Sequence, residues 1–282
     1  MITVPIAVNN DFFKRQLDLF WFNHYKIYGE NVFKKAFPIV ILQDKNNFDF
    51  SLDIPHILVS DWSCYFPDIK YYGGLSPLNM QIGLLEAIKY FNENETLELI
   101  DCDMFYIKKP PFITVDNNEF IVCDFYENWH LKSNENNKYI INKFLIKNYY
   151  KYNGGFVPII GKVKTFKKIL NDWIFFHIQI FNSLTDPRLQ WWAGMYAFQI
   201  ACANNKIKMK SLDMCYFPNV NQLNNNHYIC HYSCDKIFDK SKMLVDIVNF
   251  DSSNFPQDIY YDSVKDWYNK YKTKGEVNVG LV

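Results

Sequence analysis

Residues 97–110 read LELIDCDMFYIKKP, an apolar run that ends on two aspartates one residue apart and turns away at Pro110. Side chains alternate between the two faces of an extended strand, so we expect Asp101 and Asp103 to point the same way and Cys102 to point into the packing. Two carboxylates at the end of a buried strand repel each other and lose hydration unless a cation bridges them. Oxygen ligands suit a hard divalent ion, so this stretch predicts a site for Mg²⁺ or Mn²⁺.

A solvated turn is the competing interpretation, because an Asp-x-Asp triplet alone is common in turns. The flanking sequence favours a strand end. The approach is apolar, residues 104–107 are apolar, and the segment leaves through Pro110 and Pro111. We therefore expect both carboxylates on the edge of a strand in the core layer, not in a loop.

Composition indicates a compact α/β protein without an electrostatic partner. The 282 residues are 49% hydrophobic, enough to bury a substantial core, and no linker or internal repeat interrupts them. Thirty basic residues balance thirty acidic ones, which argues against nucleic acid or an anionic membrane as partner. We expect one domain over residues 1–250 and a helical extension packed on it over residues 251–282.

The sequence predicts a cytoplasmic location without a transmembrane anchor. Residues 1–8 form a short strand-like run and are followed at once by polar Asn9 and Asn10, unlike a cleavable signal. The longest apolar stretch, residues 173–181, is too short to span a bilayer. Seven cysteines without a Cys-x-x-Cys pair fit reduced, buried thiols.

Strands and helices alternate through the first two-thirds of the chain, which predicts an open, mostly parallel, Rossmann-like sheet flanked by helices. The expected strands are residues 2–8, 37–42, 56–60, 97–101, 119–126 and 156–160. We expect Asp11 to cap the first helix, and Ser76 with Pro77 to begin the helix that leads into the aspartate strand. Ligands of such sheets bind beyond the carboxyl ends of the strands, where Asn9, Asp61 and the two aspartates would gather.

A glycine pair precedes the strand 156–160. A plain turn explains Gly154 and Gly155. Beside a metal site the pair has a second use, because backbone without Cβ lets a bulky ligand approach, and Asn153 offers a donor and an acceptor to hydroxyl groups.

Four potential metal ligands lie late in the chain: His227, Cys230, His231 and Cys234. In a helix the first and last would lie about 10 Å apart, and in a strand neighbouring ligands would face opposite sides, so we do not expect a zinc site. We expect His231 to join Asp103 at the same cation. The alternative is a histidine packed with tyrosine in an aromatic core.

Several of these segments resemble a known enzyme group. LELIDCDMFYIKKP resembles the Asp-x-Asp strand of GT-A fold nucleotide-sugar glycosyltransferases, YNGGFVPI their sugar-site strand, and CHYSCDKIFDK their late histidine segment. A narrower similarity is to the plant-type hydroxyproline arabinosyltransferases and peptidyl-serine galactosyltransferases. It rests on SPLNMQIGLLEAI, FIVCDFY, NGGFVPI and RLQWWAGMYAFQIACA, which occur in the same order within residues 76–240.

The resemblance implies a GT-A fold and transfer of a sugar from a nucleoside diphosphate sugar, expected to be a UDP-sugar, to a glycan or hydroxyl acceptor with retention. Asp103 would bind Mn²⁺ or Mg²⁺ directly, Asp101 would bind the metal or the ribose, and His231 would complete the coordination. The donor contacts that the resemblance implies are Val8, Asn9, Asp61, Asn79, Asp101, Asn153, Gly154, Gly155, Lys236 and Lys240. Lys236 and Lys240 are alternatively ordinary surface charges.

One residue departs from the family pattern. Gly194 stands where an acidic residue precedes the Met-Tyr pair, so the role of that carboxylate is either absent or supplied by another residue such as Asp186 or Gln190. We expect the catalytic residues to be Asp101, Asp103 and Gln190.

The acceptor side is expected at Asp124, Trp191 and Trp192. In a helix over residues 188–203 the adjacent tryptophans lie about 100° apart, so we expect one indole to face the sugar cleft. Alternatively, both are buried at the flanks of a wide apolar face.

Two other functions compete with transfer. A noncatalytic carbohydrate-binding protein on the same fold is favoured by the aromatic content and Gly194. A sugar nucleotidyltransferase would share the carboxylate pair, but VNNDFF stands where a Gly-rich, basic phosphate loop would be.

Overall fold

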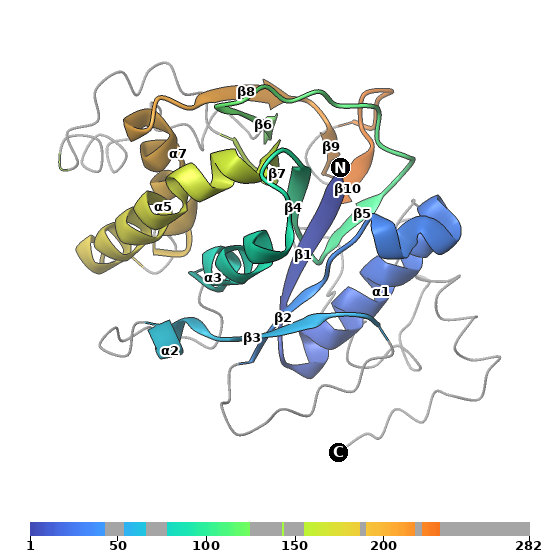
Figure 1. The fold of residues 1–282 in the computed structure, drawn as a ribbon, viewed down its shortest axis with the longest axis horizontal. Coiled ribbons are helices and arrows are strands. Elements are labelled where there is room, and N and C mark those ends of the chain that lie inside the picture. Colours follow the sequence, from blue (N-terminus) through green and yellow to red (C-terminus); the bar gives the residue numbers. More distant parts are fainter. Residues whose placement is uncertain are drawn as a thin grey trace.

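A seven-stranded sheet forms the centre of the protein (Figure 1). The computed structural model describes residues 1–42, 54–65, 78–124, 143, 155–186, 190–217 and 222–231. The sheet strands are β1 (Ile2–Val8), β2 (Ile39–Leu42), β3 (Ile57–Ser60), β4 (Thr96–Asp101), β6 (Glu119–Asp124), β7 (Gly155–Lys162) and β8 (Lys208–Leu212). Their order is β3-β2-β1-β4-β7-β6-β8, and only β7 runs antiparallel to its neighbours. The predicted α/β class with a mostly parallel sheet is confirmed.

A second, three-stranded sheet joins a segment late in the sequence to the residues that follow β4. It consists of β5 (Met104–Tyr106), β10 (Ile229–His231) and β9 (Cys215–Tyr216), in the order β5-β10-β9. β10 pairs antiparallel with β5, and His231 lies opposite Met104. This pairing places His231 next to the residues that follow β4.

Helices cover both faces of the large sheet (Figure 1). α1 (Asp11–Tyr28) lies beside β5 on one face, and α3 (Leu78–Ala87), α5 (Val163–Ser183) and α7 (Ala193–Asn204) cover the other. A Cβ at Gly83 of α3 would lie 2.9 Å from the Ile6 side chain, so this helix approaches β1 closely because it has glycine there. Short helical turns are η1 (Gly29–Lys34), α2 (Trp62–Tyr65) and η2 (Ile88–Tyr90).

Two predicted element boundaries are wrong. The side chain of Asn10, not Asp11, caps α1, because its Oδ1 accepts from the Phe13 N–H at 2.9 Å. The expected helix over residues 188–203 is interrupted at Trp192, which is the N-cap of α7. The expected start at Ser76 and Pro77 and the extension over residues 251–282 lie outside the described residues.

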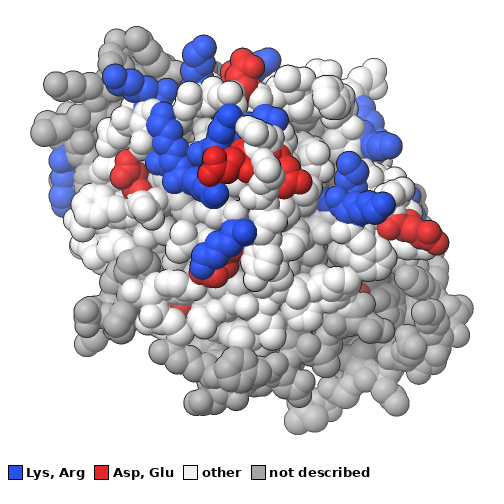
Figure 2. Space-filling model, in the orientation of Figure 1, with Lys and Arg blue, Asp and Glu red and all other residues white. Residues whose placement is uncertain are grey.

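The surface carries no field of a single sign on the face drawn in Figure 2, where basic side chains lie beside acidic ones. Among the described residues, Lys167 lies 3.1 Å from Glu93 and Lys89 lies 2.7 Å from Glu86. Exposed pairs of this kind contribute about 0–1 kcal/mol each to stability. None of the helices in the described segments combines the length and apolar character needed to cross a bilayer.

Candidate metal and nucleotide-sugar site

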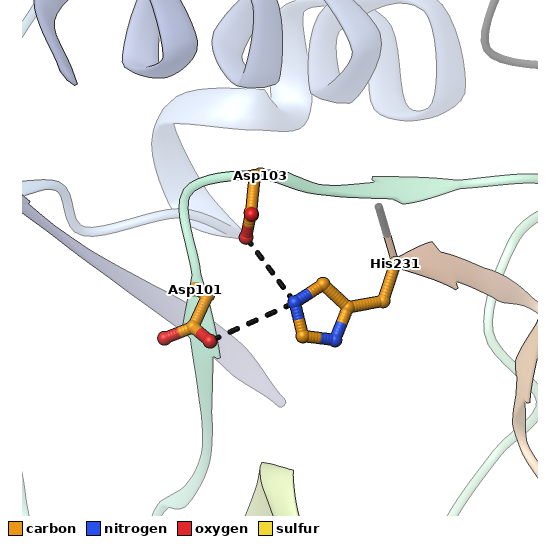
Figure 3. A group of neighbouring side chains, drawn as sticks. All are labelled: Asp101, Asp103 and His231. Carbon is orange, nitrogen blue, oxygen red and sulfur yellow. Dashed lines mark ion pairs between the residues drawn. The ribbon is translucent and has the colours of Figure 1, made fainter. Parts of the chain in front are cut away.

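Asp101 is the last residue of β4, a central strand of the large sheet. β4 lies between β1 and β7, and its residues 97–100 are buried, so the strand is fixed on both sides up to Asp101. The strand ends there. Asp103 lies in the two-residue turn between β4 and β5, not on an extended strand as predicted. The turn still projects both carboxylates toward the same point (Figure 3).

Helix α1 holds this turn through two buried polar side chains. The Cys102 thiol points into the packing as predicted and donates to Gln16 Oε1 at 3.1 Å. The amide of Asn23 donates to the Tyr106 carbonyl at 3.1 Å and accepts from the Tyr106 N–H at 2.8 Å. The backbone on both sides of Asp103 is therefore anchored to one helix.

His231 completes a triad with the two aspartates (Figure 3). Its Nε2 lies 3.4 Å from Asp103 Oδ1 and 3.8 Å from Asp101 Oδ2. The His231 side chain is 6% exposed, whereas Asp101 and Asp103 are 34% and 16% exposed, so the acids line the solvent side of the group. The structure brings His231 beside Asp103, and their binding to one cation stays a prediction.

The triad has the chemistry and the dimensions of a divalent cation site. Its three ligand atoms all lie within 4.8 Å of one another. Ligands about 2.1 Å from one octahedral ion are separated by about 3 Å when adjacent and about 4.2 Å when opposite. Two carboxylate oxygens and one imidazole nitrogen suit Mn²⁺ or Mg²⁺, and movements of less than about 1 Å bring them to ligand distance.

The other polar residues predicted at the donor site follow the carboxyl edge of the same sheet. Asn9 follows β1 and its N–H donates to the Ile41 carbonyl at 2.8 Å, while Asp61 follows β3 and its N–H donates to the Leu42 carbonyl at 3.1 Å. Asn79, in the first turn of α3, accepts from the Trp62 N–H at 3.1 Å through Oδ1. Its Nδ2 is buried without a hydrogen-bond partner among the described residues.

The antiparallel direction of β7 explains why Gly155, at the start of that strand, reaches the same edge. Gly155 opens β7 and lies opposite Asp124, the last residue of β6. Val8 ends β1 at this edge. The predicted donor residues Asn153, Gly154, Lys236 and Lys240 lie outside the described residues.

Gly194 lies where three helices meet. A Cβ on it would be 3.2 Å from His177 Cε1 and 3.3 Å from Gln81 Nε2, and its carbonyl accepts from Trp173 Nε1 at 2.8 Å. His177 of α5 and Gln81 of α3 are buried and lie 3.1 Å apart, Nδ1 to Oε1. A carboxylate at residue 194 would have to displace this pair.

Gln190, Trp191 and Trp192 lie in three different environments. The Gln190 amide nitrogen donates to the Leu184 carbonyl at 2.8 Å, so this side chain caps the end of α5. Trp191 is 53% exposed, whereas Trp192 is partly buried and packs against the core. The alternative in which both indoles are buried is therefore wrong, and the cleft-facing role stays a prediction for Trp191.

Within the described residues, His227 and Cys230 do not join a metal group, and Cys234 lies outside those residues. The Nε2 of His227 lies 2.8 Å from Asp213 Oδ1, and the Asn224 N–H lies 3.1 Å from its Nδ1, which fixes a surface turn. Within the described part of the chain the triad is the one cluster of at least three metal-ligating side chains. Sequence reasoning did not single out Glu98, a fully buried acid in β4, although an acid inside an apolar run was a visible signal.

Comparison with known proteins assigns the family. The model of the hydroxyproline O-arabinosyltransferase family N-terminal domain matches residues 8–211. The fold is similar to that of the galactosyltransferase LgtC in complex with donor and acceptor sugar analogues, at a TM-score of 0.52 and 9% identity over 97% of this chain and 100% of that one.

Two further solved structures show the same fold. They are the bifunctional glycosyltransferase WbbM (TM-score 0.53, 10% identity, 95% of this chain and 51% of that one) and GlyE of Streptococcus pneumoniae TIGR4 (TM-score 0.50, 9% identity, 98% and 64%). No curated protein sequence matches the chain. The family match covers well over half of the chain and selects the enzyme over the noncatalytic carbohydrate-binding alternative. The chain therefore belongs to the hydroxyproline O-arabinosyltransferase family and is a glycosyltransferase with a GT-A fold.

Proposed function

We propose that the protein transfers a sugar from a UDP-sugar to a hydroxyl group of a glycan or peptide acceptor, with a divalent cation at Asp101, Asp103 and His231. The observation that carries this proposal is the convergence of the three side chains on one point at the carboxyl edge of the sheet. The family name supports a hydroxyl acceptor such as hydroxyproline and a pentose donor.

The chemistry needs a positive charge at this place. Breaking the bond between a sugar and a diphosphate develops positive charge on the sugar and negative charge on the departing phosphates. Mn²⁺ or Mg²⁺, held by Asp101, Asp103 and His231, would supply electrostatic stabilisation of the diphosphate. The two partly exposed carboxylates of the triad leave the solvent side open for the remaining ligands, the phosphate oxygens and water.

The polar residues along the sheet edge supply the donor contacts in this proposal. The buried Nδ2 of Asn79 is a hydrogen-bond donor without a partner in the described residues, and such a group is costly to leave unsatisfied. A carbonyl or hydroxyl oxygen of the nucleotide sugar would satisfy it. Asp61, 8% exposed, and Asn9 offer acceptors for ribose or base. We further propose that the transfer retains the anomeric configuration and that the protein acts in the cytoplasm.

Removal of the cation provides the test of the metal assignment. Purified protein is incubated with a panel of nucleotide sugars and a hydroxyproline peptide before and after exhaustive chelation. We expect hydrolysis or transfer from one UDP-sugar, its loss after chelation, and recovery when Mn²⁺ or Mg²⁺ is returned. Full activity in the chelated protein would contradict the metal role, and activity with non-uridine donors alone would contradict the donor assignment.

Trp191 provides a separate test of the acceptor side. Its 53% exposure means that Trp191→Ala should cost less than about 1 kcal/mol of folding free energy, far below the cost of a core truncation. If its indole stacks on the acceptor, transfer should fall about tenfold or more while donor hydrolysis is kept. Phe175→Ala is the matched control, because Phe175 is 55% exposed on α5. Equal transfer by the two variants would remove Trp191 from the acceptor site.

A further inference from the structure

A buried carboxyl group lies in the strand that ends at the proposed metal site. Glu98 is in the central strand β4 and is fully buried. Its Oε2 accepts from Thr3 Oγ1 at 2.9 Å and from the Tyr106 hydroxyl, and its Oε1 accepts from the Tyr228 hydroxyl at 3.2 Å. Thr3 Oγ1 and Tyr106 Oη also lie 2.8 Å apart. The group therefore joins four segments of the chain at one carboxylate.

The members of this cluster have a constant spacing from the members of the triad. Glu98 is three residues before Asp101 in β4, and Tyr228 is three residues before His231. Tyr106 is three residues after Asp103. Each of the three backbone segments that carry a triad residue is thus tied, three residues away, to the Glu98 carboxylate.

Burial of the Glu98 carboxyl group has a free-energy cost that an apolar side chain would not have. Burial raises the pKa of Glu98, and the groups that bond it in the described part of the chain are hydroxyls, not a lysine or arginine. Proteins in which such buried charged groups are replaced by apolar side chains of similar volume are often equally stable or more stable. Hydrogen bonds from hydroxyl groups to one carboxylate fix the distance between particular atoms, whereas apolar contacts do not.

Such a fixed distance is needed between β10 and the segment that carries the two aspartates. β10 is a three-residue strand, and it is separated from β5 by more than a hundred residues of chain. The backbone pairing of β10 with β5 sets their register, but β10 has no backbone pairing with β4. The bonds of Tyr106 and Tyr228 to Glu98 supply that link from both strands.

We propose that Glu98 is a positioning residue, which sets the separation of His231 from Asp101 and Asp103 and thereby the affinity of the site for a divalent cation. This inference rests on the proposed metal role of the triad. Glu98 itself touches no cation or substrate. Its effect passes through Tyr228 to His231 and through Tyr106 to Asp103.

The test is a cation titration of Glu98→Gln. Glutamine keeps the shape and one accepting oxygen, but its NH₂ group only donates, so one hydroxyl that donates to Glu98 in the wild type has to rotate and accept, which disturbs that tie. We expect Mn²⁺ affinity, measured by calorimetry in the presence of UDP, to fall about tenfold or more, as for other residues that orient metal ligands. UDP binding without metal should change less than twofold, which a general loss of structure would not allow.

A double-mutant cycle separates positioning from general stability. His231→Ala removes the ligand through which Tyr228 acts, so Glu98→Gln should weaken Mn²⁺ binding much less in that background than in the wild type. Tyr228→Phe provides a second variant should Glu98→Gln fold poorly, and we expect it to weaken Mn²⁺ binding as well. Tyr196→Phe is its control, because Tyr196 is a buried tyrosine of α7 outside the cluster.

The outcomes distinguish the two proposals. Wild-type protein that binds no Mn²⁺ would overturn the proposed metal site itself. Wild-type protein that binds Mn²⁺ with an affinity unchanged by both Glu98→Gln and Tyr228→Phe would overturn the positioning role alone. An equal loss from Glu98→Gln with and without His231, or an equal loss from Tyr228→Phe and Tyr196→Phe, would also overturn it.

Discussion

Asp103→Ala should reduce glycosyl transfer by at least about a hundredfold while the protein stays folded. Asp103 Oδ1 lies 3.4 Å from His231 Nε2 and is the less exposed of the two acids. In the proposed function, its loss would remove one ligand of the cation that stabilises the departing diphosphate. The apo protein should be no less stable, because removal of one of two crowded carboxylates relieves their repulsion.

The measurement is kcat with the donor identified by the nucleotide-sugar panel, together with the free energy of unfolding in denaturant without metal. Asp116→Ala is the matched control, because Asp116 is an exposed acid that precedes β6 and lies outside the triad. Unchanged kcat in Asp103→Ala would assign the Asp-x-Asp segment to a structural turn. A loss of activity that parallels a loss of stability would assign Asp103 to folding.

The parallel half of the fold was predictable because its signals are local. Each of the strands β1, β2 and β3 is a short apolar run followed by a polar residue, and helices separate β1 from β2 and β3 from β4. Parallel strands share one carboxyl edge, so Asn9, Asp61 and Asp101 could be assigned to one place without coordinates. The Asp-x-Asp spacing further predicted two acids with a common direction.

The remainder of the site depends on contacts between distant residues. The pairing of β10 with β5 joins segments more than a hundred residues apart, and no local pattern specifies it. The expectation of one continuous strand through Asp103 failed because the chain turns after Asp101 to begin the second sheet. The expectation of one helix over residues 188–203 failed because the composition of that segment does not reveal the break at Trp192. The role of Glu98 could not be predicted, because its three hydroxyl partners are distributed over the sequence from residue 3 to residue 228.

Two buried histidines predict a strong dependence of stability on pH. His24 lies in α1 against the rings of Phe20 and Tyr106, at centroid distances of 4.1 and 4.5 Å, and His177 lies in α5. Burial lowers the pKa of each of them from 6.5 to about 3, because the charged form loses its hydration. Both histidines are therefore neutral in the folded protein at pH 5, while the unfolded chain binds a proton at each.

The direction of the effect follows from that difference. Between about pH 6.5 and about pH 3 the unfolded state binds more protons than the folded state, so stability is fully present above pH 6.5 and declines as the pH falls. Each histidine contributes a slope of about 1.4 kcal/mol per pH unit within this window, so two units of acidification cost about 3 kcal/mol for each. Against a typical domain stability of about 5–15 kcal/mol, that loss is large enough to unfold the protein in mild acid.

Denaturant titrations at half-unit steps from pH 7.5 to pH 4 would measure this slope, and His24→Leu isolates one contribution. At pH 7 the variant loses ring contacts with Phe20 and Tyr106 but also removes two buried ring nitrogens that have no hydrogen-bond partner among the described residues, so its stability should change little. Its slope below pH 6 should nevertheless be shallower by about 1.4 kcal/mol per pH unit, since one proton-binding difference has been removed. The comparison of slopes, not of absolute stabilities, is what decides. Identical slopes in the two proteins would mean that His24 becomes protonated in the folded state without penalty, and the packing around its ring would then have to admit water.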